Sequence, residues 1–164
     1  MKHILLQYIA IILVSIALNS CSSMEDVALQ NPYISHLVNT GCLSHWDTDN
    51  AESRSEVTKG SFEMLFEEQV AKCKFSSLDY PCDYKQVNVK ITYNNRTMTI
   101  IEYPSSDTAD CRCEIDASFT IENLPQNEFI LKIYHGNTKG NLDNETPRFE
   151  GVVNKTDGKI IIPY

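Results

Sequence analysis

Residues 110–133 read DCRCEIDASFTIENLPQNEFILKI, and this stretch decides the fold that the sequence predicts. Successive side chains of a β-strand point to opposite faces of the sheet. Every second residue from Cys111 to Ile121 is apolar or carries sulfur, whereas the residues between them are polar. A turn around Pro125 then leads into a second apolar run at 129–133. The stretch therefore predicts a β-hairpin arm with two cysteines on its apolar face.

Other segments with strand patterning surround this arm. Apolar and polar residues alternate over 87–93, and Asn94-Asn95-Arg96 turns the chain into 97–102, which predicts a hairpin. Two short strands are predicted near the end of the chain, at 148–153 and 159–162. Short strands separated by regular turns predict an all-β fold, an antiparallel β-sandwich of about seven strands.

The start of the chain has the form of an export signal. A positive start precedes the apolar run Ile4–Leu18, which is shorter than the ~20 residues that a transmembrane helix needs. The run ends in Leu18-Asn19-Ser20-Cys21, which resembles the bacterial lipoprotein box, where a peptidase cuts before a cysteine that carries diacylglycerol. This predicts a signal peptide at 1–20 and a lipid on Cys21. The alternative is an ordinary cleaved signal, with Cys21 as one more disulfide partner.

The mature chain divides by composition into two parts. Residues 21–57 are polar and acidic and predict a lipid-anchored tether, and 58–164 is the predicted β-sandwich domain. Within that domain, the apolar residues of 61–75 fit helical spacing, and many of the residues between them favour helix.

A resemblance bears on this ambiguous segment. It rests on motifs in a fixed order over about residues 60–135: an apolar segment ending in Cys73, the hairpin 87–102, the cysteine arm 110–113, the run 119–124 and the strand 129–133. This order resembles a group of small cell-envelope lipoproteins of Bacteroidales. The resemblance implies a β-sheet domain on a lipid anchor, with 61–75 extended, and it implies no activity. We therefore predict strand at 61–75, against local propensity.

The cysteines predict disulfides. If Cys21 carries lipid, five of the six cysteines remain, so at least one is unpaired within the chain. Cysteines two apart on one strand face reach neighbouring segments more easily than each other. The predicted bridged set is Cys42, Cys73, Cys111 and Cys113, with the connectivity left open. Cys82 is the predicted free thiol.

These cysteines would also suit two kinds of chemistry, a redox pair and a metal site. A redox pair of Cys111 and Cys113 beside Arg112 is the first, but no thioredoxin-like βαβ pattern surrounds it. A metal site at Cys42 and His45 is the second, but no convincing second ligand pair accompanies it. The sequence therefore predicts structural bridges and no metal.

The net charge disfavours nucleic-acid binding, and the sequence lacks the common catalytic motifs. The net charge is −8, and removal of Lys2 with the leader leaves 13 Lys and Arg against 22 Asp and Glu, or −9, which disfavours nucleic acid as a partner. Nucleophile-elbow, zinc-protease and phosphate-loop motifs are absent from the sequence, so no catalytic residue and no cofactor is predicted. Asp107-Thr108-Ala109 resembles a Bacteroidales O-glycosylation acceptor, which makes Thr108 a candidate for modification.

The sequence as a whole predicts a non-enzymatic lipoprotein of the bacterial outer membrane, on its periplasmic or surface face. The membrane is its expected partner, through the lipid on Cys21. An envelope protein or a glycan is a further candidate partner, the glycan because a platform of aromatic side chains would suit it. The candidate aromatics are Trp46, Tyr80, Tyr84, Tyr93, Tyr103 and Tyr134. The alternatives are an envelope thiol–disulfide protein that uses the Cys-x-Cys pair, or a secreted adhesin or inhibitor.

Overall fold

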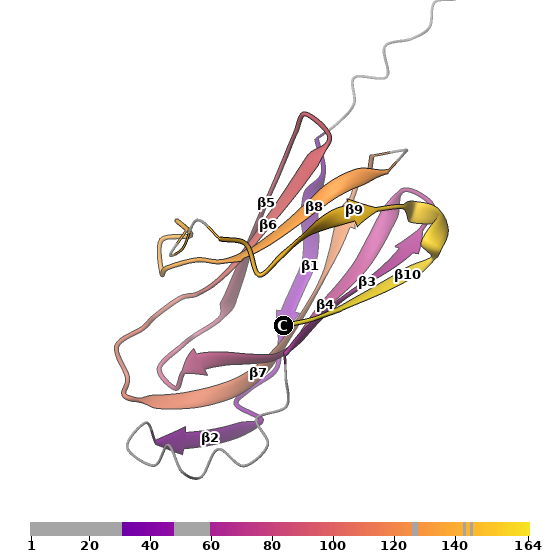
Figure 1. The fold of residues 1–164 in the computed structure, drawn as a ribbon. Helices are drawn as coiled ribbons and strands as arrows, with labels where there is room; N and C mark the ends of the chain where they lie inside the picture. The colour runs from indigo at the N-terminus through magenta and orange to yellow at the C-terminus, as the bar shows by residue number, and fades with distance from the viewer. Residues whose placement is uncertain (1–30, 48–59, 126–127, 143, 145) are drawn as a thin grey trace, which may run out of the picture. The chain divides into compact units, whose positions relative to one another are not determined.

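A computed structural model describes residues 31–47, 60–125, 128–142, 144 and 146–164. The described chain forms ten strands and one short 3₁₀ turn, and the strand order is drawn in Figure 1. The strands are β1 (Tyr33–Asn39), β2 (Ser44–Asp47), β3 (Ser61–Glu67), β4 (Val70–Pro81), β5 (Val87–Asn94), β6 (Thr97–Pro104), β7 (Cys111–Glu122), β8 (Phe129–His135), β9 (Phe149–Val153) and β10 (Lys159–Pro163), and the turn is η2 (Lys155–Asp157).

The strands form two sheets. The first, sheet A, has the order β1-β7-β4-β3-β10, and β2 also pairs with β7. The second, sheet B, has the order β5-β6-β8-β9. Both sheets contribute to one cluster of buried apolar side chains, so the fold is the predicted β-sandwich.

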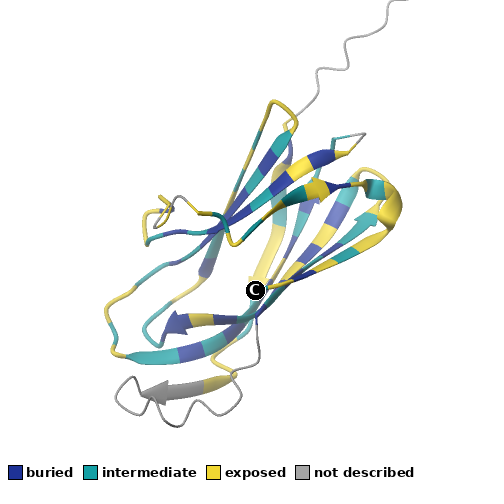
Figure 2. Ribbon diagram, viewed as in Figure 1, coloured by how far each residue is buried: buried dark blue, intermediate teal, exposed yellow. Residues whose placement is uncertain are grey.

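The alternation predicted for the central strand is confirmed. Along β7, Cys113, Ile115, Ala117, Phe119 and Ile121 are buried, while the residues between them are partly or fully exposed. Figure 2 shows the same banding along several strands of both sheets. β7 pairs with β4 on one side and with β1 and β2 on the other, which places it in the middle of sheet A.

Two details of the predicted topology are corrected. β7 and β8 were expected to form a hairpin arm, but β7 belongs to sheet A and β8 to sheet B, so their connection passes from one sheet to the other. Asn123, with φ 55°, lies in this connection. β8 pairs with β6 in parallel, so the sandwich is not wholly antiparallel.

The segment 61–75 is extended, as the resemblance implied. It contains β3 and the first half of β4, which pair with each other across a turn at Glu68 and Gln69. Glu68 adopts φ 51°, and the backbone N–H of Leu124 donates to the Gln69 carbonyl at 2.8 Å. The turn interrupts the segment near its middle, so its helical spacing does not produce a helix.

The predicted tether is corrected over its middle part. β1 and β2 fall within 21–57 and pair with β7, so the sandwich domain already includes 33–47. Compact packing extends from Asn31 to Tyr164. The predicted signal peptide at 1–20 and the residues just after it lie outside the described residues.

Candidate functional site

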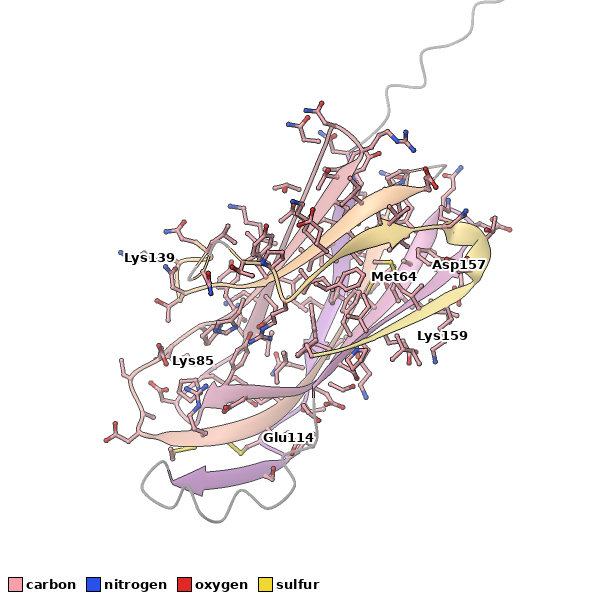
Figure 3. All side chains as sticks on the ribbon, viewed as in Figure 1. Met64, Lys85, Glu114, Lys139, Asp157 and Lys159 are labelled. Atoms are coloured by element: carbon pink, nitrogen blue, oxygen red, sulfur yellow. A yellow bond between two sulfur atoms is a disulfide. The ribbon has the colours of Figure 1, made fainter. Side chains whose placement is uncertain are left out.

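The structure pairs the cysteines in two bridges on β7. Cys42 is bonded to Cys113 with Cα atoms 5.3 Å apart, and Cys82 is bonded to Cys111 with Cα atoms 5.5 Å apart. These separations are usual for disulfides. Figure 3 shows yellow sulfur atoms beside the end of β7 that β2 lines. The predicted bridging of Cys42, Cys111 and Cys113 is confirmed.

The other half of the cysteine prediction is wrong, and strand register explains why. Pro81 of β4 lies opposite Arg112, so Cys82 is the next residue along the ladder and reaches Cys111, whose carbonyl accepts its N–H at 2.9 Å. Cys73 instead lies opposite Phe119, far along β7 from both bridges. Cys82 is therefore bridged and Cys73 carries the free thiol.

Cys73 is an interior residue. Its exposed fraction is 3%, and burial raises the pKa of its thiol well above the usual value. A buried neutral thiol is a poor nucleophile, because the thiolate is the reactive form.

The redox and metal alternatives find no support in this geometry. Cys111 and Cys113 are bonded to different partners, and the Arg112 side chain pairs with Asp79 at 2.8 Å. The sulfur of Cys42 is in a bridge, so it does not offer a thiolate to a metal beside His45. The described residues contain no group of three or more His, Cys, Asp or Glu side chains that could hold a metal ion.

A buried polar cluster lies between the sheets, and the sequence analysis missed it. Glu102 of β6 has no exposed surface and is the one charged side chain in the described core. Its Oε1 accepts from His135 Nδ1 at 2.8 Å and from Arg148 Nη1 at 2.7 Å, and its Oε2 accepts from the Tyr80 hydroxyl. We call Tyr80, Glu102, His135 and Arg148 the Glu102 cluster.

The cluster joins four segments of the chain. Tyr80 comes from sheet A, Glu102 and His135 lie on neighbouring strands of sheet B, and Arg148 directly precedes β9. The Arg148 guanidinium lies 5.0 Å from the centre of the Tyr164 ring. Burial, followed by the negative charge of Glu102, raises the pKa of Tyr164.

The hydrogen bonds of this cluster connect the two sheets, because Tyr80 belongs to sheet A and Glu102 to sheet B. A buried carboxylate is costly unless charged or polar donors satisfy it, and here one cation and two further donors do so. The alternation of Met98 and Ile100 along β6 is the sequence signal that would have placed Glu102 on the buried face.

The candidate modification site, Thr108, lies in an exposed loop in which hydroxyl groups donate hydrogen bonds to Asp83. Asp83 accepts hydrogen bonds from the hydroxyls of Ser106 and Thr108. These bonds, Ser106 first, lower the pKa of Asp83 to about 2. An O-glycan on Thr108 would replace the hydroxyl proton that Asp83 accepts, so modification would alter this loop.

The tyrosines do not form an exposed platform. Tyr80 and Tyr134 are 1% and 8% exposed, and Tyr84 and Tyr93 pack against the core. Tyr103 is covered by the backbone near Gly140, where an added Cβ would lie 2.9 Å from the ring. These side chains contribute to packing, which is the more common role of strand aromatics.

Comparison with known proteins gives no relative from which a role could be transferred. No family model matches the chain, and no curated protein or solved structure matches it. In the part of the chain that the structure describes, no helix is long and apolar enough to cross a membrane. Cys21 lies outside the described residues.

Proposed function

We propose that this protein is an outer-membrane lipoprotein of the bacterial envelope, in which a lipid on Cys21 anchors a disulfide-linked β-sandwich. The sandwich acts as a non-enzymatic binding or structural module. Acyl chains contribute ~0.8 kcal/mol per buried methylene, so two or more of them anchor a domain stably without a transmembrane helix.

The observation that carries the proposal is the inventory of cysteines. Four of the six are paired within the sandwich, and the fifth, Cys73, is buried in its core. Cys21 is therefore left without an accessible partner in the described domain. A cysteine in this position, directly after an export signal and Leu18-Asn19-Ser20, is what lipid attachment requires.

The same inventory weighs against the two alternatives. A secreted protein with all six cysteines paired would need a bond between Cys21 and Cys73, a residue that is only 3% exposed. A thiol–disulfide protein would need Cys111 and Cys113 to act as one couple, but each is bonded elsewhere.

Intact mass of the protein extracted from native membranes tests the anchor. We expect a mature chain that begins at Cys21 and carries the added mass of a diacylglycerol and an N-acyl chain. A Cys21→Ser variant, matched in every other residue, should lack this mass and should keep the leader uncut, because the peptidase cuts only before a lipid-bearing cysteine. A mature chain of unmodified mass that is equally soluble with and without Cys21 would refute the proposal.

A further inference from the structure

Exposed apolar side chains gather on one edge of the sandwich. Eight large hydrophobic residues are exposed among the described residues, and four of them follow one another along β1 and the residues just before β2. They are Tyr33 at 53%, Leu37 at 36%, Val38 at 65% and Leu43 at 57% exposed. We call these four residues the apolar edge. Figure 2 shows β1 as an exposed or intermediate strand, and it contains no buried residue.

The residues of this edge also carry no charge of their own, although Ser35 and Ser44 donate to Glu122 and Glu114 of β7. From Asn31 to Trp46 the sequence contains no Asp, Glu, Lys or Arg, although such residues make up 22% of the chain. The other sheet edges carry exposed charges: Lys90 on β5, Glu150 on β9 and Lys159 on β10. Edge strands usually carry charges that discourage unwanted contacts, so an apolar edge whose own residues are uncharged suggests an interaction surface.

The backbone of β1 is unsuited to pairing with a partner strand. The register of β1 against β7 shifts between Ser35 and Val38, and His36 adopts φ 53°. Such irregularities blunt a sheet edge, because they interrupt the row of donors and acceptors that a new strand would need. The apolar side chains therefore favour an apolar contact over strand addition.

The chain length between the anchor and this edge is short. Ten residues lead from Cys21 to Asn31, which bounds the distance between them at ~35 Å even for a fully extended chain. If Cys21 is anchored as proposed above, the apolar edge begins within this reach of the bilayer surface.

We infer that the apolar edge rests on the lipid surface to which the protein is anchored. This inference depends on the proposed lipid at Cys21. Tyr side chains favour the interface between lipid and water, and Leu and Val favour the acyl region below it. The protein is acidic and the edge has no Lys or Arg, so the fitting surface is zwitterionic, as in phosphatidylcholine. The contact is weak alone and acts together with the anchor.

Trp46 provides a natural reporter. It is the one tryptophan of the chain, and it lies in β2, opposite Arg112 of β7, so its backbone is at the same edge of sheet A as β1. We would reconstitute the acylated full-length mature protein into phosphatidylcholine vesicles, with and without bromine atoms on the upper acyl chains. We expect the brominated lipid to quench Trp46 fluorescence.

Two variants make the test specific. Trp46→Phe combined with Ile161→Trp moves the reporter to an exposed position on β10, the opposite edge of sheet A, and should abolish quenching. Leu37→Ser combined with Val38→Ser should reduce the quenching of Trp46. Both changed residues are exposed, so the variant should fold.

The outcomes separate this inference from the proposed function. A lipid mass on Cys21 with no quenching of Trp46, or with equal quenching at position 161, overturns the edge contact alone. Absence of the lipid mass overturns both. Anchored protein that forms dimers in vesicles, with Trp46 shielded from brominated lipid, would assign the edge to a second copy of the chain and also overturn the inference.

Discussion

Glu102 shows what a single buried carboxylate does in this sandwich. It sits between the sheets and accepts bonds from Tyr80, His135 and Arg148, which belong to three other segments. Because these partners come from both sheets, the cluster fixes how the sheets pack against each other.

The Tyr80 hydroxyl is the part of this cluster that can be removed most cleanly. Tyr80→Phe keeps the ring, which is 1% exposed, and deletes one bond to a charged acceptor. We expect the free energy of unfolding to fall by about 1.5–3 kcal/mol, the usual contribution of a hydrogen bond to a charged group. Urea unfolding under oxidising conditions measures this.

Tyr33→Phe is the matched control for that variant. Tyr33 is 53% exposed, so the same chemical change should alter stability by less than ~0.5 kcal/mol. Equal effects of the two substitutions would show that the Tyr80 hydroxyl contributes nothing through Glu102.

Asp83 gives a prediction about pH. Bonds from Ser106 and Thr108 lower its pKa to about 2, whereas an unperturbed Asp has a pKa of ~3.9. Since the folded value is the lower one, the stabilisation is complete above pH ~4 and is lost as the pH falls through about 2. An NMR titration of the Asp83 carboxyl carbon should give this value in the native protein.

Ser106→Ala should raise the pKa of Asp83 toward its ordinary value, because the largest cause of the shift is removed. An unchanged titration in this variant would show that the hydroxyl does not bond to the carboxylate in solution. Natural protein modified at Thr108 would show a similar rise, since the glycan removes the second donor.

Among the elements, β1 is a strand whose side chains are at most partly buried. It has no buried residue, and the Cys42–Cys113 bridge lies just beyond its end. We expect the double variant Cys42→Ser, Cys113→Ser to exchange the amide hydrogens of 33–39 faster than the parent protein. Ladder bonds to β7, the packing of Ile34 and the hydrogen bonds of Asn39 and Thr40 then hold this strand without a covalent link.

The second bridge supplies the control for that experiment. Cys82→Ser with Cys111→Ser breaks a bond between β4 and β7, which also pair along most of their length. Exchange in 33–39 should then stay close to that of the parent. Equal protection of 33–39 in both double variants would show that the Cys42 bridge does not hold β1.

Elements with strict alternation were predictable, and the way they pair was less so. The strands at 87–93 and 111–121 follow directly from side-chain period, and both are confirmed. The β7–β8 hairpin was wrong because period defines the faces of a strand and not the sheet to which the next strand belongs. β1 was not predicted because its residues do not alternate between apolar and polar. The irregular backbone near His36 interrupts the alternation, so the segment resembles a loop.

For the molecule as a whole, the sandwich class was predictable and the cysteine pairing only in part. Cys111 and Cys113 were correctly assigned to bridges with other segments, because their positions on one strand face decide this. The exchange of roles between Cys73 and Cys82 depends on the register of β4 against β7, which a single sequence does not specify. The Glu102 cluster depends on contacts between the two sheets. A single sequence does not specify these contacts either, so the cluster was not predicted.

The measurement that tests the central claim most directly is a thiol count on the protein from native membranes, alkylated after denaturation, first without and then with reduction. With Cys21 blocked by lipid and four cysteines bridged, one thiol should be alkylated without reduction, on Cys73, and five after it. Alkylation of Cys82, Cys111 or Cys113 without reduction, or no alkylation at all, would contradict the account.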